Sequence, residues 1–81
     1  MLFLVEYDRS KGSLSQIIAY ADSERDLADR ARLSLELSLH RKGIKREVVL
    51  LEAASEEALR KTHRRYFEDL AELARLALSS T

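Results

Sequence analysis

The sequence predicts an α+β domain in which a β-hairpin is followed by a helix, a third strand and a second helix. Three observations support this expectation. Two stretches rich in strand-forming residues flank a glycine-containing turn near the N-terminus. Two later stretches repeat apolar residues at helical spacing, and a short continuous apolar run of strand length lies between them.

The first two strands are expected at residues 2–7 and 14–21. Both segments are rich in aliphatic and aromatic side chains, which favour strands. The segment 8–12 between them is Asp-Arg-Ser-Lys-Gly, and Gly12 can adopt the positive φ that a tight turn requires. A hairpin is therefore expected at the start of the domain.

The first helix is expected to begin at Ser23, an N-cap residue type, with Asp26 three residues later. Its end is predicted at residues 40–44, where cations occupy the last turn and Gly43 suits the left-handed position after a helix. Leucines at every second position of 33–39 also fit a strand, but helix propensity and the end signals favour a helix. The stripe expected to face the sheet is Leu27, Ala31, Leu35 and Leu39, with Ala28 and Ser38 beside it.

The third strand is expected at residues 47–52, which enclose four consecutive apolar residues. Ser55, followed by two glutamates, predicts the N-cap of the second helix. Because no Pro or Gly follows, one continuous helix is expected from about residue 55 to about 79, with 79–81 frayed. It would be roughly 37 Å long, against about 23 Å for a seven-residue strand, so its end should overhang the sheet. Its expected stripe is Leu59, His63, Tyr66, Phe67, Leu70, Leu73, Ala74 and Ala77.

The simplest sheet has three strands in the order 2-1-3 and is packed with the two helices, because a strand that returns through a helix does so in a right-handed crossover. A chain of 81 residues is expected to build one hydrophobic core, so residues 1–81 are expected to form a single domain. The composition, with 46% hydrophobic and 35% charged residues, is typical of a folded chain.

A cytoplasmic location is expected. The chain has no Cys, so its stability must come from packing or association, and a reducing compartment fits. Glu6 interrupts the N-terminal apolar run long before a signal-peptide core or a membrane span would be complete. No membrane partner is therefore expected.

Both faces of the predicted sheet are apolar, so either the two helices divide between the faces or a second protein covers one of them. We expect a small non-catalytic interaction module that forms a homodimer through the second sheet face or the C-terminal helix, with other protein partners unidentified. In the alternative, the remaining leucines are scattered surface residues without a role. The candidate interface residues, which lie off the main helical stripes, are Leu33, Leu37, Leu76 and Leu78.

A second reading is the binding of nucleic acid or an anionic ligand, because clustered cations can neutralise phosphates. Cations at a helix C-terminus are also explained by the helix dipole. The formal net charge of zero and the absence of interleaved aromatic residues make nucleic acid the less favoured partner. The candidate basic patch is Arg41, Lys42, Lys45 and Arg46, with Arg60, Arg64 and Arg65 as further members.

A third reading is a small enzyme with His63 and Tyr66 as acid and base in a pocket. We expect instead that His63 is a half-buried packing residue and that the Tyr66 hydroxyl meets Asp8 or Glu6. With two His and no Cys, neither a metal site nor a cofactor is expected. The two glycines do not form a phosphate-loop or dinucleotide fingerprint, and no catalytic residue is assigned.

Residues 48–53 followed by 55–67, together with the opening 3–8 and the turn at Gly12, resemble small stand-alone bacterial proteins of uncharacterised function. The resemblance spans residues 3–67 and implies no activity. It implies that a polar cluster beside the hairpin is the first place to test. This cluster consists of Thr62, His63, Arg65 and Tyr66.

Overall fold

The computed structural model describes residues 1–68 and confirms the α+β arrangement with the strand order β2-β1-β3. Strand β1 pairs antiparallel with both of its neighbours. The elements, in chain order, are β1 (Leu2–Asp8), β2 (Ser13–Tyr20), the 3₁₀ turn η1 (Asp22–Glu24), α1 (Arg25–Arg41), β3 (Glu47–Glu52), α2 (Glu56–Thr62) and the 3₁₀ turn η2 (Arg64–Tyr66).

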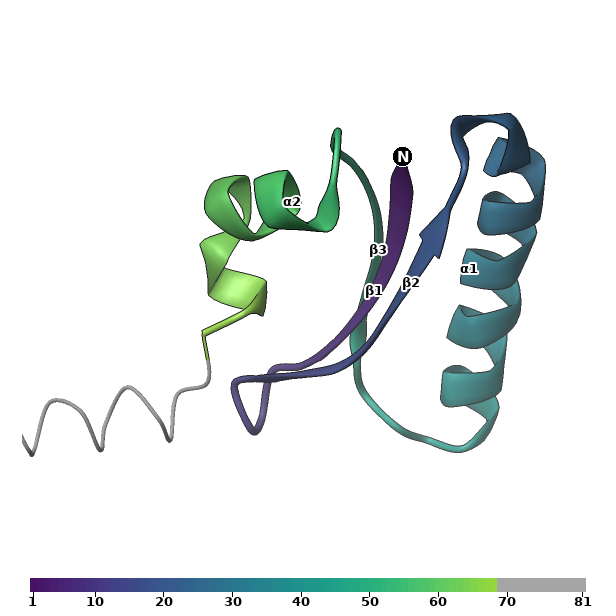
Figure 1. Ribbon diagram of the computed structural model, residues 1–81. Coiled ribbons are helices and arrows are strands. Elements are labelled where there is room, and N and C mark those ends of the chain that lie inside the picture. The colour runs from purple at the N-terminus through teal and green to yellow at the C-terminus, as the bar shows by residue number, and fades with distance from the viewer. Residues whose placement is uncertain (69–81) are drawn as a thin grey trace, which may run out of the picture.

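The two helical parts lie on opposite sides of the sheet (Figure 1). Helix α1 runs along one face, and α2 with η2 lies over the other. The helices therefore divide between the faces, which is the first of the two arrangements expected from the apolar strands. Strand β1, at the centre of the sheet, is buried along its whole length, whereas β2 and β3 at the edges are only partly buried.

Alternate residues of β1 serve different faces, because successive side chains of a strand point to opposite sides. On the α2 side, the buried core consists of Phe3, Val5, Tyr7, Leu59 and Tyr66. Leu2 and Leu4 alternate with these residues and are each 1% exposed. Ala28 is the one residue of α1 that is fully buried. Its small side chain allows α1 to lie close to the sheet.

The turn between β1 and β2 is organised by the carboxylate of Asp8. Its Oδ1 accepts hydrogen bonds from the Ser10 hydroxyl (2.6 Å), the Ser10 amide (3.0 Å) and the Lys11 amide (3.3 Å). Gly12 closes the turn with φ of +63° and donates its N–H to the Asp8 carbonyl at 2.8 Å. The predicted role of Gly12 is confirmed.

Strand β2 contains a bulge opposite the junction of Glu6 and Tyr7. Glu6 pairs with Gln16 while Tyr7 pairs with Leu14, so Ser15 is an extra residue on β2. A bulge bends its strand and leaves one residue outside the ladder.

The start of α1 differs from the expectation, and its end agrees with it. Ser23 lies inside η1 and is not an N-cap; instead, the Ala21 N–H donates to the Glu24 side chain at 2.8 Å. At the other end, Gly43 has φ of +68° and donates to the His40 carbonyl at 3.1 Å. Ile44 donates to the Leu39 carbonyl at 3.0 Å, which completes a Schellman motif.

The buried stripe of α1 also differs at its first residue. Leu27 was expected to face the sheet but is 53% exposed, whereas its neighbour Ala28 is completely buried. The close approach of α1 to β3, where Arg25 pairs with Glu52 at 3.5 Å, favours the smaller side chain on the inner face.

Helix α2 begins as predicted, with the Ser55 hydroxyl accepting from the Ala58 N–H at 3.1 Å. It ends at Thr62, so the expectation of a continuous helix is wrong at His63, whose φ and ψ are −124° and 51°. The Thr62 hydroxyl donates to the Ala58 carbonyl at 3.1 Å. The change of chain direction at His63 allows Tyr66 to pack on the sheet, where it is 6% exposed. The expected continuation to residue 79 lies outside the described residues.

Within residues 1–68, we find no helix with the length and apolar character that crossing a membrane requires.

The core position of Leu59 gives a testable prediction. Leu59 is fully buried, so we expect Leu59→Ala to lower the free energy of unfolding by about 2–5 kcal/mol. Leu27→Ala is the matched control because it removes the same atoms from an exposed helical site, and it should change stability by no more than about 0.5 kcal/mol. Urea denaturation followed by circular dichroism measures both. Similar losses for the two variants would contradict this packing.

Candidate functional site

Two guanidinium groups converge on one carboxylate, that of Glu47 at the start of β3. Arg9, from the hairpin turn, donates to Glu47 Oε1 at 2.6 Å. Arg65, from η2, donates to both oxygens, at 2.9 Å and 2.7 Å. The Glu47 side chain is only 13% exposed, so these bonds are shielded from water on much of their surface. Three segments that are distant in the sequence meet here.

Aromatic rings complete this arrangement. Tyr7 and Tyr66 meet edge to face, with ring centroids 5.4 Å apart and an interplanar angle of 84°. The Arg65 guanidinium lies 4.4 Å from the centre of the Tyr66 ring and also donates to its hydroxyl at 2.8 Å. We name the five residues the Glu47 cluster: Tyr7, Arg9, Glu47, Arg65 and Tyr66.

The contacts within the Glu47 cluster favour the charged forms of Glu47 and Arg65. Burial on its own raises the pKa of Glu47, but hydrogen bonds with Arg9, Arg65 and Tyr66 outweigh it, so the pKa lies below its ordinary value. The Tyr66 hydroxyl and the Glu47 carboxylate raise the pKa of Arg65. Both groups are therefore charged at neutral pH. Such a pair is suited to fixing η2 on the sheet and is poorly suited to proton transfer.

The predicted polar cluster of Thr62, His63, Arg65 and Tyr66 does form in one region, as the chain turns from α2 into η2. The Thr62 hydroxyl lies 2.9 Å from His63 Nδ1. The His63 ring stacks on Tyr66 with centroids 6.5 Å apart.

The expected partner of the Tyr66 hydroxyl, Asp8 or Glu6, is wrong, because Arg65 occupies that position. A hollow of about 190 Å³ beside Tyr66 is lined by Ser13, Leu14, Arg60, Tyr66, Phe67 and Glu68, without His63.

Sequence reasoning missed Tyr7, Arg9 and Glu47 as members of this cluster. The strand register would have indicated two of them, because Tyr7 and Glu47 are directly paired between β1 and β3. Without that register, the sequence does not identify Glu47 as the partner of Arg65.

Arg46, a member of the predicted basic patch, belongs to a second buried ionic group together with Glu6 and Asp8. Glu6 and Asp8 are 8% and 5% exposed. Arg46 lies 3.4 Å from Glu6 and 3.7 Å from Asp8, and it donates to the Ser15 hydroxyl at 2.6 Å. The hydrogen bond from the Ser10 hydroxyl contributes most to lowering the pKa of Asp8 below its ordinary value. Arg46 therefore balances internal carboxylates.

The remaining basic patch is smaller than the sequence predicts. Arg60 pairs with Glu56 at 3.2 Å and lies over the Phe67 ring at 4.6 Å. Arg64 pairs with Glu68 at 3.1 Å, and Arg65 belongs to the Glu47 cluster. Within residues 1–68, three members of the patch have no ion-pair partner, and all three are exposed: Arg41, Lys42 and Lys45.

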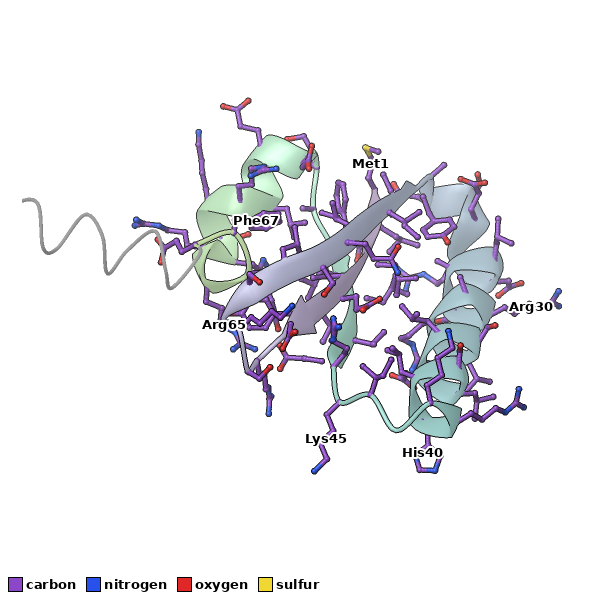
Figure 2. The ribbon with its side chains drawn as sticks, turned by 90° about the horizontal axis from the view of Figure 1, so that it is seen from below. Met1, Arg30, His40, Lys45, Arg65 and Phe67 are labelled. Atoms are coloured by element: carbon purple, nitrogen blue, oxygen red, sulfur yellow. The ribbon has the colours of Figure 1, made fainter. Side chains whose placement is uncertain are left out.

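Two open hollows meet at the loop between α1 and β3, where Lys45 points outward (Figure 2). One has a volume of about 470 Å³ and is lined by Arg9, Ser10, Lys45, Arg46 and Glu47. The other has a volume of about 450 Å³ and is lined by Glu36, Leu39, His40, Ile44, Lys45, Arg46 and Val48. Carboxylates contribute to both linings. In the part of the chain that the structure describes, no three metal-ligating side chains come together.

The outer side of α1, away from the sheet, exposes aliphatic side chains. Leu33 and Leu37 are 52% and 46% exposed and lie one helical turn apart. Leu27, in the first turn of α1, and Ile44, in the loop after α1, are also exposed. The other two candidate interface residues, Leu76 and Leu78, lie outside the described residues.

No protein-family model, curated protein or solved structure matches this chain.

The Glu47 cluster gives a prediction with a defined pH dependence. Because the pKa of Glu47 is lower in the folded protein than in the unfolded chain, its stabilising effect is complete above the ordinary pKa of about 4.3 and disappears as the pH falls through the folded value. We therefore expect Glu47→Gln to lower the free energy of unfolding by about 1 kcal/mol at pH 7 and by less at acid pH. Urea denaturation of the unaltered protein and the variant, at pH 7 and at acid pH, measures the difference in the free energy of unfolding.

Glu52→Gln is the matched control, because Glu52 ends the same strand but is 65% exposed and, within residues 1–68, pairs only with Arg25. It should have little effect at any pH. Equal losses for both variants, or a loss for Glu47→Gln that persists at low pH, would contradict the role of this cluster.

Proposed function

We propose that this protein is a small non-catalytic interaction module that acts in the cytoplasm and self-associates through the outer side of α1. The observation that carries the proposal is the exposure of Leu33 and Leu37, which are 52% and 46% accessible although both faces of the sheet are already covered by helices. Two adjacent half-exposed leucines on a helix are a typical contact surface for another helix.

A second copy is the partner that this surface fits best. The chain has a formal net charge of zero, so two copies have no overall repulsion to overcome. A two-fold interface uses the same patch on both subunits, so one apolar strip is sufficient. Covering the exposed half of each leucine contributes roughly 1 kcal/mol, and a dimer has four of them.

The strength of this association should be modest. Joining two molecules costs at least about 4 kcal/mol in lost freedom of motion, which offsets the whole gain from the four leucines. A dissociation constant in the micromolar range corresponds to a binding free energy of about −8 kcal/mol. Reaching it would need additional contacts, such as Ile44 and charged pairs. We therefore expect a dimer that forms at high micromolar protein concentration and dissociates on dilution.

The binding of an anionic ligand or nucleic acid is the second candidate. It is favoured by Arg41, Lys42 and Lys45, which lie around the loop between α1 and β3. It is weakened by the engagement of Arg46 with Glu6 and Asp8. Phosphate binding falls steeply between low and moderate salt, so titration of a labelled oligonucleotide at two salt concentrations distinguishes the two functions.

The leading proposal predicts the behaviour of a variant with the two changes Leu33→Gln and Leu37→Gln. Glutamine preserves helix propensity but removes the apolar contact. In sedimentation equilibrium at high micromolar concentration, the unaltered protein should approach twice its mass of 9.3 kDa, while the variant should remain monomeric. Its circular dichroism spectrum should be unchanged.

Ile18→Thr is the matched control, because Ile18 is a similarly exposed aliphatic residue, 39% accessible, on the edge strand β2. It should leave the dimer intact. An unaltered protein that sediments as a 9.3 kDa monomer at high micromolar concentration would overturn the proposal.

A further inference from the structure

We infer that the two copies pair helix α1 against helix α1 in antiparallel orientation about a two-fold axis, with Leu33 of each copy against Leu37 of the other. This inference rests on the proposed self-association and specifies its geometry. It follows from the spacing of the exposed residues along α1 and from the distribution of charge between the two ends of the helix.

The outer side of α1 has a line of residues at alternating spacings of four and three. Such spacing keeps side chains on one narrow strip of a helix, as at the contact line of paired helices. Arg30, within this strip, points away from the sheet, and His40 lies at the C-terminal end of the helix (Figure 2). The strip consists of Asp26, Arg30, Leu33, Leu37 and His40, all of which are exposed.

Charge changes sign from one end of α1 to the other. The N-terminal end carries Asp22, Glu24 and Asp26, whereas the C-terminal end and the following loop carry Arg41, Lys42 and Lys45. Arg25 also lies at the N-terminal end but pairs with Glu52 of the same chain at 3.5 Å, and Asp22 pairs with the Met1 amine at 2.9 Å, so Glu24 and Asp26 are the carboxylates of this end that can face the partner subunit. An antiparallel pair places the acidic end of each copy over the basic end of the other. A parallel pair places like charges together at both ends. The helix dipoles have the same preference.

The leucine contact fixes which charged residues lie near one another. When Leu33 lies opposite Leu37 of the partner subunit, residue numbers across the interface sum to about 70. Asp26 then lies level with position 44 of the partner subunit, one helical turn or less from Arg41, whose long side chain can span that distance. Neither Asp26 nor Arg41 has an ion-pair partner within residues 1–68.

The same register separates the arginines at position 30. In the antiparallel pair, Arg30 lies opposite the partner's His40, whereas in a parallel pair it would lie opposite a second Arg30. Because of the two-fold axis, the contact between Asp26 and Arg41 occurs twice in each dimer. Asp26, Arg30 and Arg41 of both copies, six charged side chains in all, therefore distinguish the two orientations.

The experiment reverses these charges one at a time and together. In an antiparallel dimer, Asp26→Lys alone creates two repulsive contacts with Arg41, and Arg41→Glu alone creates two with Asp26. Each single variant should raise the dissociation constant roughly three- to tenfold at low salt. The variant with both changes restores opposite charges across the interface and should return the dissociation constant to near its original value. Sedimentation equilibrium measures all four proteins.

A mixture of the two single variants tests the same contact without altering either chain further. In the mixed dimer, the lysine introduced by Asp26→Lys faces the glutamate introduced by Arg41→Glu, and the unaltered Arg41 faces the unaltered Asp26. Mixing should therefore recover the dimer that each variant forms poorly alone. Helix stability within each chain does not change on mixing, which separates the interface effect from any loss of helix. Circular dichroism of each variant checks that α1 is retained.

Cysteine cross-linking gives an independent measurement, since the chain contains no Cys. One population has Leu33→Cys and the other has Leu37→Cys, with a tag on one to distinguish their masses. The antiparallel register predicts that mild oxidation gives the mixed disulfide faster than either self-linked product. A parallel register predicts the reverse.

The outcomes separate the orientation from the self-association. A dimer whose affinity is indifferent to the single charge reversals and which cross-links position 33 to position 33 overturns the antiparallel pairing but leaves the proposed function standing. An unaltered protein that stays monomeric overturns both. Weakening by each single reversal, recovery in the double variant and preferential linkage of 33 to 37 support the inference.

Discussion

The burial of β1 on both of its faces is the constraint on which the rest of the structure depends. All seven residues of this strand are buried, including Glu6 and Asp8. A three-stranded sheet exposes both faces of its central strand to water unless something covers each of them. Helix α1 covers one face, and α2 with η2 covers the other. The division of the helices therefore follows from the apolar character of one strand.

On each face of the sheet, the buried carboxylates are paired with an arginine. On the α2 side, Glu47 holds Arg65 and fixes η2. On the other side, Arg46 compensates Glu6 and Asp8, which a buried strand could not otherwise contain without a large cost of desolvation. Much of the apparent basic surface in the sequence is therefore internal charge balance. The members of the predicted basic patch that stay unpaired within residues 1–68 are Arg41, Lys42 and Lys45, at the end of α1 and in the loop that follows it.

Local signals predicted the elements, and contacts between distant residues explain the errors. Gly12, Gly43 and Ser55 have the predicted roles, because turns and caps depend on a few neighbouring residues. The end of α2 was not predictable in this way, because the helix breaks at His63 where Tyr66 packs on Tyr7, a residue from the opposite end of the described chain. Periodicity placed Leu27 inside, but it cannot resolve a rotation of the helix by one residue.

The bulge at Ser15 also affects how the molecule behaves in concentrated solution. Both outer strands, β2 and β3, have backbone groups that no further strand satisfies within residues 1–68. An extended, regular outer strand would be a template for intermolecular sheet growth and fibrils. The extra residue breaks the regular repeat of β2, and glutamates occupy both ends of β3. The extra residue and these charges therefore disfavour assembly by sheet extension.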